Sequence, residues 1–184
     1  MKRCALVLAI GLTAASSAWA QAVPQGMAEK AAAPTDPSCK GVAVEWPADL
    51  KAWGLTAVPV TAAKGGDAVP AVTPGTPARV TLAPKEDVTL AVAPPKPAED
   101  KTYAGIVAFT VTVAGPYRIA LDGGAWIDVV AGAKSLDSTS HRHGPNCSGI
   151  HKVVDFGLAA GTYQLQVSNS QAATVTLLVV PPQN

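Results

Sequence analysis

The stretch Tyr103–Gly115, YAGIVAFTVTVAG, carries the strongest β-strand signal in the chain. Its residues alternate with a two-residue period, and one set contains only Val107, Phe109, Val111 and Val113. Successive side chains of a strand point to opposite faces of a sheet, so this apolar set is expected to face the core. Val, Thr and Phe also favour strands. The stretch therefore predicts a strand that is packed on at least one face.

Other strand-length runs lie on both sides of this stretch. ARVTLAP (78–84) and EDVTLAVAP (86–94) alternate in the same way, and PYRIALDGGAWIDVV (116–130) has two such runs around Asp-Gly-Gly, which predicts a β-hairpin. GIHKVVDFGL (149–158), GTYQLQVSN (161–169) and ATVTLLVV (173–180) add three more runs. No long helical period competes with them. About eight short strands at this spacing predict an all-β fold, an antiparallel β-sandwich with a jelly-roll-like arrangement.

A local pattern occurs twice, as AGPYRIAL from Ala114 and as AGTYQLQV from Ala160. Each glycine can bend the chain before a strand. Each tyrosine can begin that strand with a buried ring and a hydroxyl in water.

The N-terminus has the pattern of a secretory signal peptide over residues 1–20. Lys2 and Arg3 precede the apolar run CALVLAIGLTAA, and AWA ends at Ala20. The run is short for a membrane span, although a retained anchor is the alternative. We expect cleavage before Gln21, a periplasmic or secreted protein with no membrane span, a flexible leader over 21–38 and a β-sandwich domain over 39–184.

A short helix is expected at PADLKAW (47–53), because proline is tolerated in a first turn and a glycine follows. Trp46 and Trp53 flank this helix. Two interpretations remain open for them: they cover one end of the core, or they form an aromatic binding surface. Trp126 is a third candidate for such a surface.

Charge and cysteine content narrow the compartment and the partners. The chain has 14 Lys and Arg against 13 Asp and Glu, with no basic patch, which argues against a nucleic-acid partner. Cys4 leaves with the signal peptide. Cys39 and Cys147 remain as an even pair in an exported chain, which predicts a disulfide. Metal ligation by their thiolates is the alternative.

The segment HRHGPNCSGIHK (141–152) contains every histidine of the chain, His141, His143 and His151, and also Cys147. The spacing His-x-His-x3-Cys-x3-His offers up to four nitrogen or sulfur ligands, which suit Zn(II) or copper. Gly144 and Pro145 indicate a loop. The alternative is a turn-rich loop held by the disulfide, with its histidines as polar surface.

Two resemblances follow from these motifs. AGPYRIAL, FGLAAGTYQLQV and the last apolar strand resemble the bacterial pre-peptidase C-terminal β-sandwich over roughly Tyr103–Val180, an accessory domain of exported proteins. With GAWIDVV, HGPNCSGIHK and TVTLLV, the whole chain resembles a family of small exported bacterial proteins that often carry the name homogentisate 1,2-dioxygenase. That name implies non-haem Fe(II), which His141 and His143 would hold with either Asp155 or His151.

The sequence therefore predicts an exported binding or accessory module whose ligand or envelope partner it does not identify. A transition metal, zinc or copper, in the histidine loop is compatible with this prediction. The alternative is the Fe(II) dioxygenase that the family name implies. Whether the protein is an enzyme stays open, and no catalytic residue is assigned.

Overall fold

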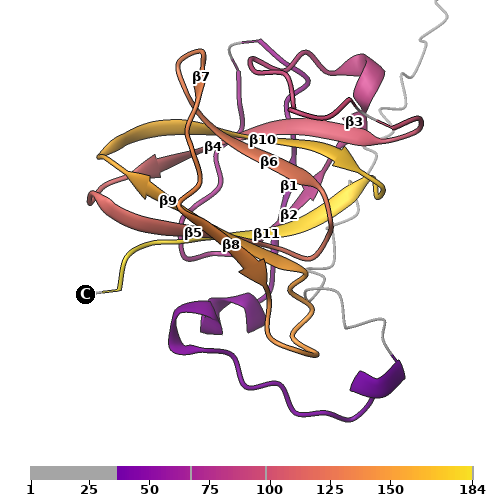
Figure 1. The fold of residues 1–184 in the computed structure, drawn as a ribbon, viewed down its shortest axis with the longest axis vertical. Coiled ribbons are helices and arrows are strands. Elements are labelled where there is room, and N and C mark those ends of the chain that lie inside the picture. The colour runs from indigo at the N-terminus through magenta and orange to yellow at the C-terminus, as the bar shows by residue number, and fades with distance from the viewer. Residues whose placement is uncertain (1–36, 67, 98, 184) are drawn as a thin grey trace, which may run out of the picture.

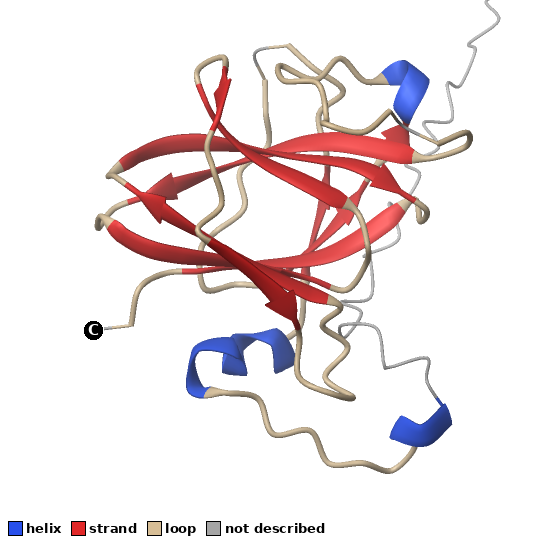
Figure 2. Ribbon diagram, viewed as in Figure 1, coloured by secondary structure: helices blue, strands red, loops and turns tan. Residues whose placement is uncertain are grey.

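The computed structural model describes residues 37–66, 68–97 and 99–183, and two β-sheets pack face to face within them (Figures 1 and 2). This arrangement confirms the predicted all-β sandwich. The predicted signal peptide, 1–20, and nearly all of the predicted leader, 21–38, lie outside the described residues. In the part of the chain that is described, no helix combines the length and apolar character needed to span a bilayer.

Within these described ranges, one sheet has six strands. Its first two strands pair in parallel, and every other neighbouring pair is antiparallel. In spatial order the strands are β1 (Val58–Thr61), β2 (Ala78–Thr81), β11 (Thr174–Val180), β5 (Gly115–Leu121), β9 (Lys152–Leu158) and β8 (Ser140–His143).

The second sheet has five strands, all paired antiparallel. In spatial order they are β3 (Ala83–Pro84), β4 (Tyr103–Val111), β10 (Gly161–Ser170), β6 (Trp126–Ala131) and β7 (Lys134–Ser135). The run 78–84 thus supplies a strand to each sheet.

The main core lies between the two sheets. Val107, Phe109 and Val111 of β4 are each only 1% exposed within it, as the alternation predicts. Val113 was expected in the same set but is 59% exposed. The reason is that β4 ends at Val111, and the chain turns there to enter β5 in the other sheet.

The predicted hairpin over 116–130 is wrong. β5 pairs with β11 and β9, whereas β6 pairs with β10 and β7, so residues 122–125 carry the chain from one sheet to the other. Two alternating apolar runs joined by glycines suit strands that face each other across a core as well as strands that lie side by side. Here β5 already has a neighbour on each edge, which leaves no edge for β6.

The predicted strand over 86–94 is also absent. Its start belongs to the 3-10 helix η3 (Lys85–Asp87), and the following residues form a loop. The buried Gln166 of β10 satisfies that loop with its side-chain amide. Its Oε1 accepts from the backbone N of Ala91 at 2.6 Å and of Val92 at 3.2 Å, and its Nε2 donates to the Val92 carbonyl at 2.9 Å. The Gln166 side chain thus pairs with backbone groups that would otherwise bond to a neighbouring strand.

Residues 37–57, which we call the strap, cover the outer face of the six-stranded sheet (Figure 1). The strap contains the 3-10 helices η1 (Pro37–Cys39) and η2 (Ala48–Gly54), and η2 confirms the helix expected near 47–53. Leu50 and Trp53 pack there in a second apolar cluster, and an ion pair between Asp49 and Arg118 joins the strap to β5. The remaining buried members of this cluster are Ala120, Ile150, Val153, Leu178 and Val180.

This packing decides the role of two tryptophans. Trp53 is 1% exposed, and the half-buried Trp46 packs against the same cluster with its ring beside Gly54. The ring of Trp53 is too deeply buried to form a binding surface, and Trp46 covers the core with the part of its ring that packs on the cluster. Of the three candidates, Trp126 alone is well exposed, at 40%.

The repeated Ala-Gly-x-Tyr pattern has the same structure in both sheets. Tyr117 and Tyr163 are buried, as expected, but their hydroxyls do not rely on water. Each donates to the carbonyl four residues earlier, at 3.1 Å to Val113 and at 2.9 Å to Ala159. Each tyrosine therefore fastens the turn that leads into its own strand.

Candidate functional site

The histidine segment forms a β-hairpin at the edge of the six-stranded sheet. β8 pairs with β9 so that His141 lies opposite Val154 and His143 lies opposite Lys152. The connecting loop is closed by short-range bonds, including Ser148 N to the Pro145 carbonyl at 3.2 Å and Ile150 N to Ser148 Oγ at 3.1 Å. The loop is therefore a defined structure that fixes where its side chains lie.

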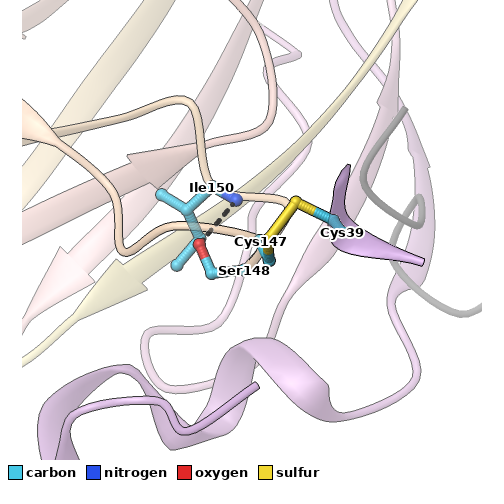
Figure 3. The surroundings of a disulfide bond; sticks show 4 residues. All are labelled: Cys39, Cys147, Ser148 and Ile150. Carbon is cyan, nitrogen blue, oxygen red and sulfur yellow. Dashed lines mark hydrogen bonds between the residues drawn. A yellow bond between two sulfur atoms is a disulfide. The ribbon is translucent and has the colours of Figure 1, made fainter. Parts of the chain in front are cut away.

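A disulfide between Cys39 and Cys147 joins the start of the strap to this loop (Figure 3). It confirms the predicted pairing and removes both thiolates from any set of metal ligands. The neighbouring Ser148 and Ile150 are buried, so the cystine sits on a packed part of the loop. Such a bond is compatible with an oxidising compartment outside the cytoplasm.

The structure brings two of the three histidines together. The rings of His143 and His151 meet edge to face with their centroids 5.8 Å apart. His143 Nδ1 also lies 3.3 Å from the His151 carbonyl oxygen. Both side chains are exposed, and both line a cleft at one end of the sandwich, whereas His141 lines a different cavity.

Asp155, the carboxylate suggested for iron, lies elsewhere. It is opposite Ser140 in the β8–β9 ladder, one position from the His141–Val154 pair, and so projects from the other face of the sheet. Its Oδ2 accepts from Ser140 Oγ at 2.7 Å and from an Arg142 guanidinium nitrogen at 2.8 Å. Arg118 Nε lies 3.4 Å from the same carboxylate. The set His141, His143 and Asp155 is therefore not assembled.

Metal-ligating side chains also do not gather in larger groups. In residues 37–66, 68–97 and 99–183, no group of three or more His, Cys, Asp or Glu side chains is placed to hold a metal ion. The residues present thus do not fit the three-ligand Fe(II) centre that the resemblance implies. The His143–His151 pair is the arrangement closest to a metal site in the loop.

The cleft that holds this pair, the end cleft, has a volume of about 930 Å³. Its walls are the β5–β6 crossing, the β8–β9 loop, the β10–β11 turn and the residues Lys96, Pro97 and Glu99. These segments come from both sheets and meet only in the folded chain. The disulfide lies in the wall formed by the β8–β9 loop.

Charged groups of both signs line the end cleft. Burial raises the pKa of Asp122 above its ordinary value of 3.8, although hydrogen bonds from Thr176 and the charge of Arg79 oppose the rise. Near the opening, Gln171 Nε2 donates to Glu99 Oε2 at 3.0 Å. The lining therefore combines imidazoles, carboxyls, amides and basic groups, which suits a polar ligand.

A second cavity of about 300 Å³, the side pocket, lies where β6 and β7 of one sheet face β8 and β9 of the other. Trp126 and His141 line it, together with Asp128 and Lys152. Burial lowers the pKa of Lys152 below 10.5, and its amine donates to the Ala125 carbonyl.

Sequence reasoning missed both cavities as such. Asp122 was visible only as a turn residue, and nothing near Lys152 in the sequence indicated that its amine would be partly buried. Nothing in the sequence marked Lys96, Pro97, Glu99 and residues 169–171 as cleft residues, because they reach the end cleft only through the sheet topology.

No known protein family model matches this chain, and no curated protein sequence matches it. The resemblances to the pre-peptidase C-terminal domain and to the proteins named homogentisate 1,2-dioxygenase therefore remain predictions.

Proposed function

We propose that this chain is an exported binding module that takes up a transition-metal ion, Zn(II) or copper, in the end cleft through His143 and His151. The observation that carries the proposal is the edge-to-face contact of these two exposed imidazoles at 5.8 Å. Imidazole nitrogen is a preferred ligand of both metals. Two protein ligands leave the other coordination positions for water or for a second molecule in the cleft.

The surroundings favour this use of the pair. His143 lies on β8 and His151 lies immediately before β9, so a paired ladder sets their separation. The disulfide and the bonds within the loop hold the chain between them. Less conformational entropy is then lost when a ligand binds, because much of the order is already present.

The proposed compartment rests on two features. Residues 1–20 have the pattern of a signal peptide, and the disulfide suits an oxidising environment. The partner of the module in the envelope or the medium is the molecule that completes the metal site or fills the rest of the cleft. The dioxygenase interpretation is not carried into this proposal, because Asp155 faces away from His141 and His143.

The test is calorimetric titration of zinc chloride, and of a copper(II) salt, into protein recovered from the periplasm and freed of metal. We expect one site, and His143→Ala and His151→Ala should each weaken it at least about tenfold, or 1.4 kcal/mol. His141→Ala is the matched control, since it removes the same group from the same strand and face but outside the end cleft.

Equal losses in His141→Ala and His143→Ala would contradict the pair as the site. Absence of binding in the unmodified protein would contradict metal uptake itself.

A further inference from the structure

Trp126, the first residue of β6, lines the side pocket and is 40% exposed. Its indole is not free to turn, because Nε1 donates to Asp128 Oδ2 at 3.0 Å. The other oxygen of that carboxylate accepts from Ser135 Oγ at 3.0 Å. A fixed, exposed ring loses little conformational entropy when a flat ligand stacks on it.

The pocket beside this ring has two kinds of lining. Ile127, Val154 and Phe156 are buried members of the main core and line the pocket on the side of the core, where Ile127 projects from the face of β6 opposite to Trp126. Ser138, Asp137 and the amine-bearing Lys152 supply hydrogen-bond donors and acceptors. Few, well-placed polar groups over an apolar surface are typical of a small-molecule site.

The charges in the pocket favour a neutral ligand. Two carboxylates, Asp128 and Asp137, stand beside two basic side chains, Lys152 and His141, so neither sign dominates. The Lys152 amine is already bonded to the Ala125 carbonyl, and Asp128 is occupied by two neutral donors. A neutral molecule with one apolar face and a rim of hydroxyl groups suits the indole and the polar side chains of the pocket.

We propose that the side pocket is a carbohydrate site, in which a neutral hexose ring of a longer glycan stacks on the Trp126 indole. The C–H face of the sugar lies against the indole, and its hydroxyls bond to the side chains at the rim. The site is separate from the histidine pair, so it does not depend on metal uptake. A volume of about 300 Å³ holds one sugar ring and leaves its neighbours outside.

The test is a titration of the ¹⁵N-labelled protein, recovered from the periplasm, followed by its indole N–H signals in NMR spectra. The probes are the neutral tetrasaccharides of β-1,4-glucose, α-1,4-glucose and β-1,4-N-acetylglucosamine. At least one should shift the Trp126 signal in a saturable way. The signals of Trp46 and Trp53 are internal references, because these rings belong to the strap and pack in the second apolar cluster, away from the side pocket.

Trp126→Ala should weaken the binding of that tetrasaccharide at least about tenfold, and Trp126→Phe should retain part of it, because the ring face remains. Urea unfolding of each variant shows that it is folded, and this control does not depend on metal uptake. The proposal is overturned if none of the three probes shifts the Trp126 signal, or if Trp126→Ala binds as the unmodified protein does. Saturable binding of phenylalaninamide in place of every sugar would also overturn it, in favour of a peptide site.

Discussion

Replacing both cysteines, as Cys39→Ala with Cys147→Ala, should lower the free energy of unfolding by several kcal/mol. The bond joins residues 108 apart, and loop-closure entropy for a ring of that size gives about 4.8 kcal/mol at 25 °C. The cystine joins the strap to a loop and belongs to neither sheet, so the folded core should survive its removal. Most of the effect should then come from a less restricted unfolded chain.

Equilibrium urea unfolding, followed by tryptophan fluorescence, measures this effect. We expect a loss of about 3–5 kcal/mol and a steeper dependence on urea, because an unfolded chain without the bond exposes more surface. The native protein treated with reductant should unfold at the same urea concentration as the double variant. This comparison controls for effects of the substitutions themselves. Coincident unfolding curves for the oxidised protein and the double variant would refute the reasoning.

Three further predictions concern stability, and urea unfolding measures each. Trp53→Ala should lower the free energy of unfolding by about 3–5 kcal/mol, since this side chain of the strap is 1% exposed. A loss below about 1 kcal/mol would mean that the strap does not pack on the sheet. Gly105→Ala should lower the free energy of unfolding by about 1–3 kcal/mol, because the added Cβ would clash with the Ala62 Cβ. An unchanged urea midpoint would argue against that close approach. Asp122→Asn should stabilise the protein near pH 7. The raised pKa of Asp122 means that the folded state disfavours its charge, so this penalty is full above the raised pKa and disappears as the pH falls toward 3.8. The variant should therefore lack this pH dependence; parallel pH profiles for the variant and the native protein would contradict the assignment.

Much of the fold was predictable from local sequence. The period-two runs that became β4, β9, β10 and β11 bury the side chains that alternation assigns to the core. The cysteine pairing followed from composition and the signal-like N-terminus. These features depend on short-range patterns or on counting, which a single sequence contains.

The errors have a common physical cause, which is that periodicity does not determine the partner of a strand. The runs that became β5 and β6 looked like a hairpin but lie in different sheets. The run over 86–94 had strand character, yet Gln166 from a distant strand satisfies its backbone instead.

The candidate site shows the same limit. The three histidines are neighbours in sequence, but the structure pairs His143 with His151 and places His141 in another cavity. Alternation along the β8–β9 ladder separates Asp155 from the histidines, and that register was not visible beforehand. The sequence also did not show that Trp126 is exposed whereas Trp53 is buried, because both residues have apolar neighbours in the chain.

The central claim is that His143 and His151 hold a transition-metal ion in the end cleft, and a crystal structure of the zinc-loaded protein tests it most directly. Data collected on both sides of the zinc absorption edge identify the metal by its anomalous scattering. We expect one strong anomalous peak within bonding distance of a ring nitrogen of each histidine, about 2.0–2.1 Å. A peak at His141 alone, or no peak at the pair in zinc-saturated crystals, would contradict it.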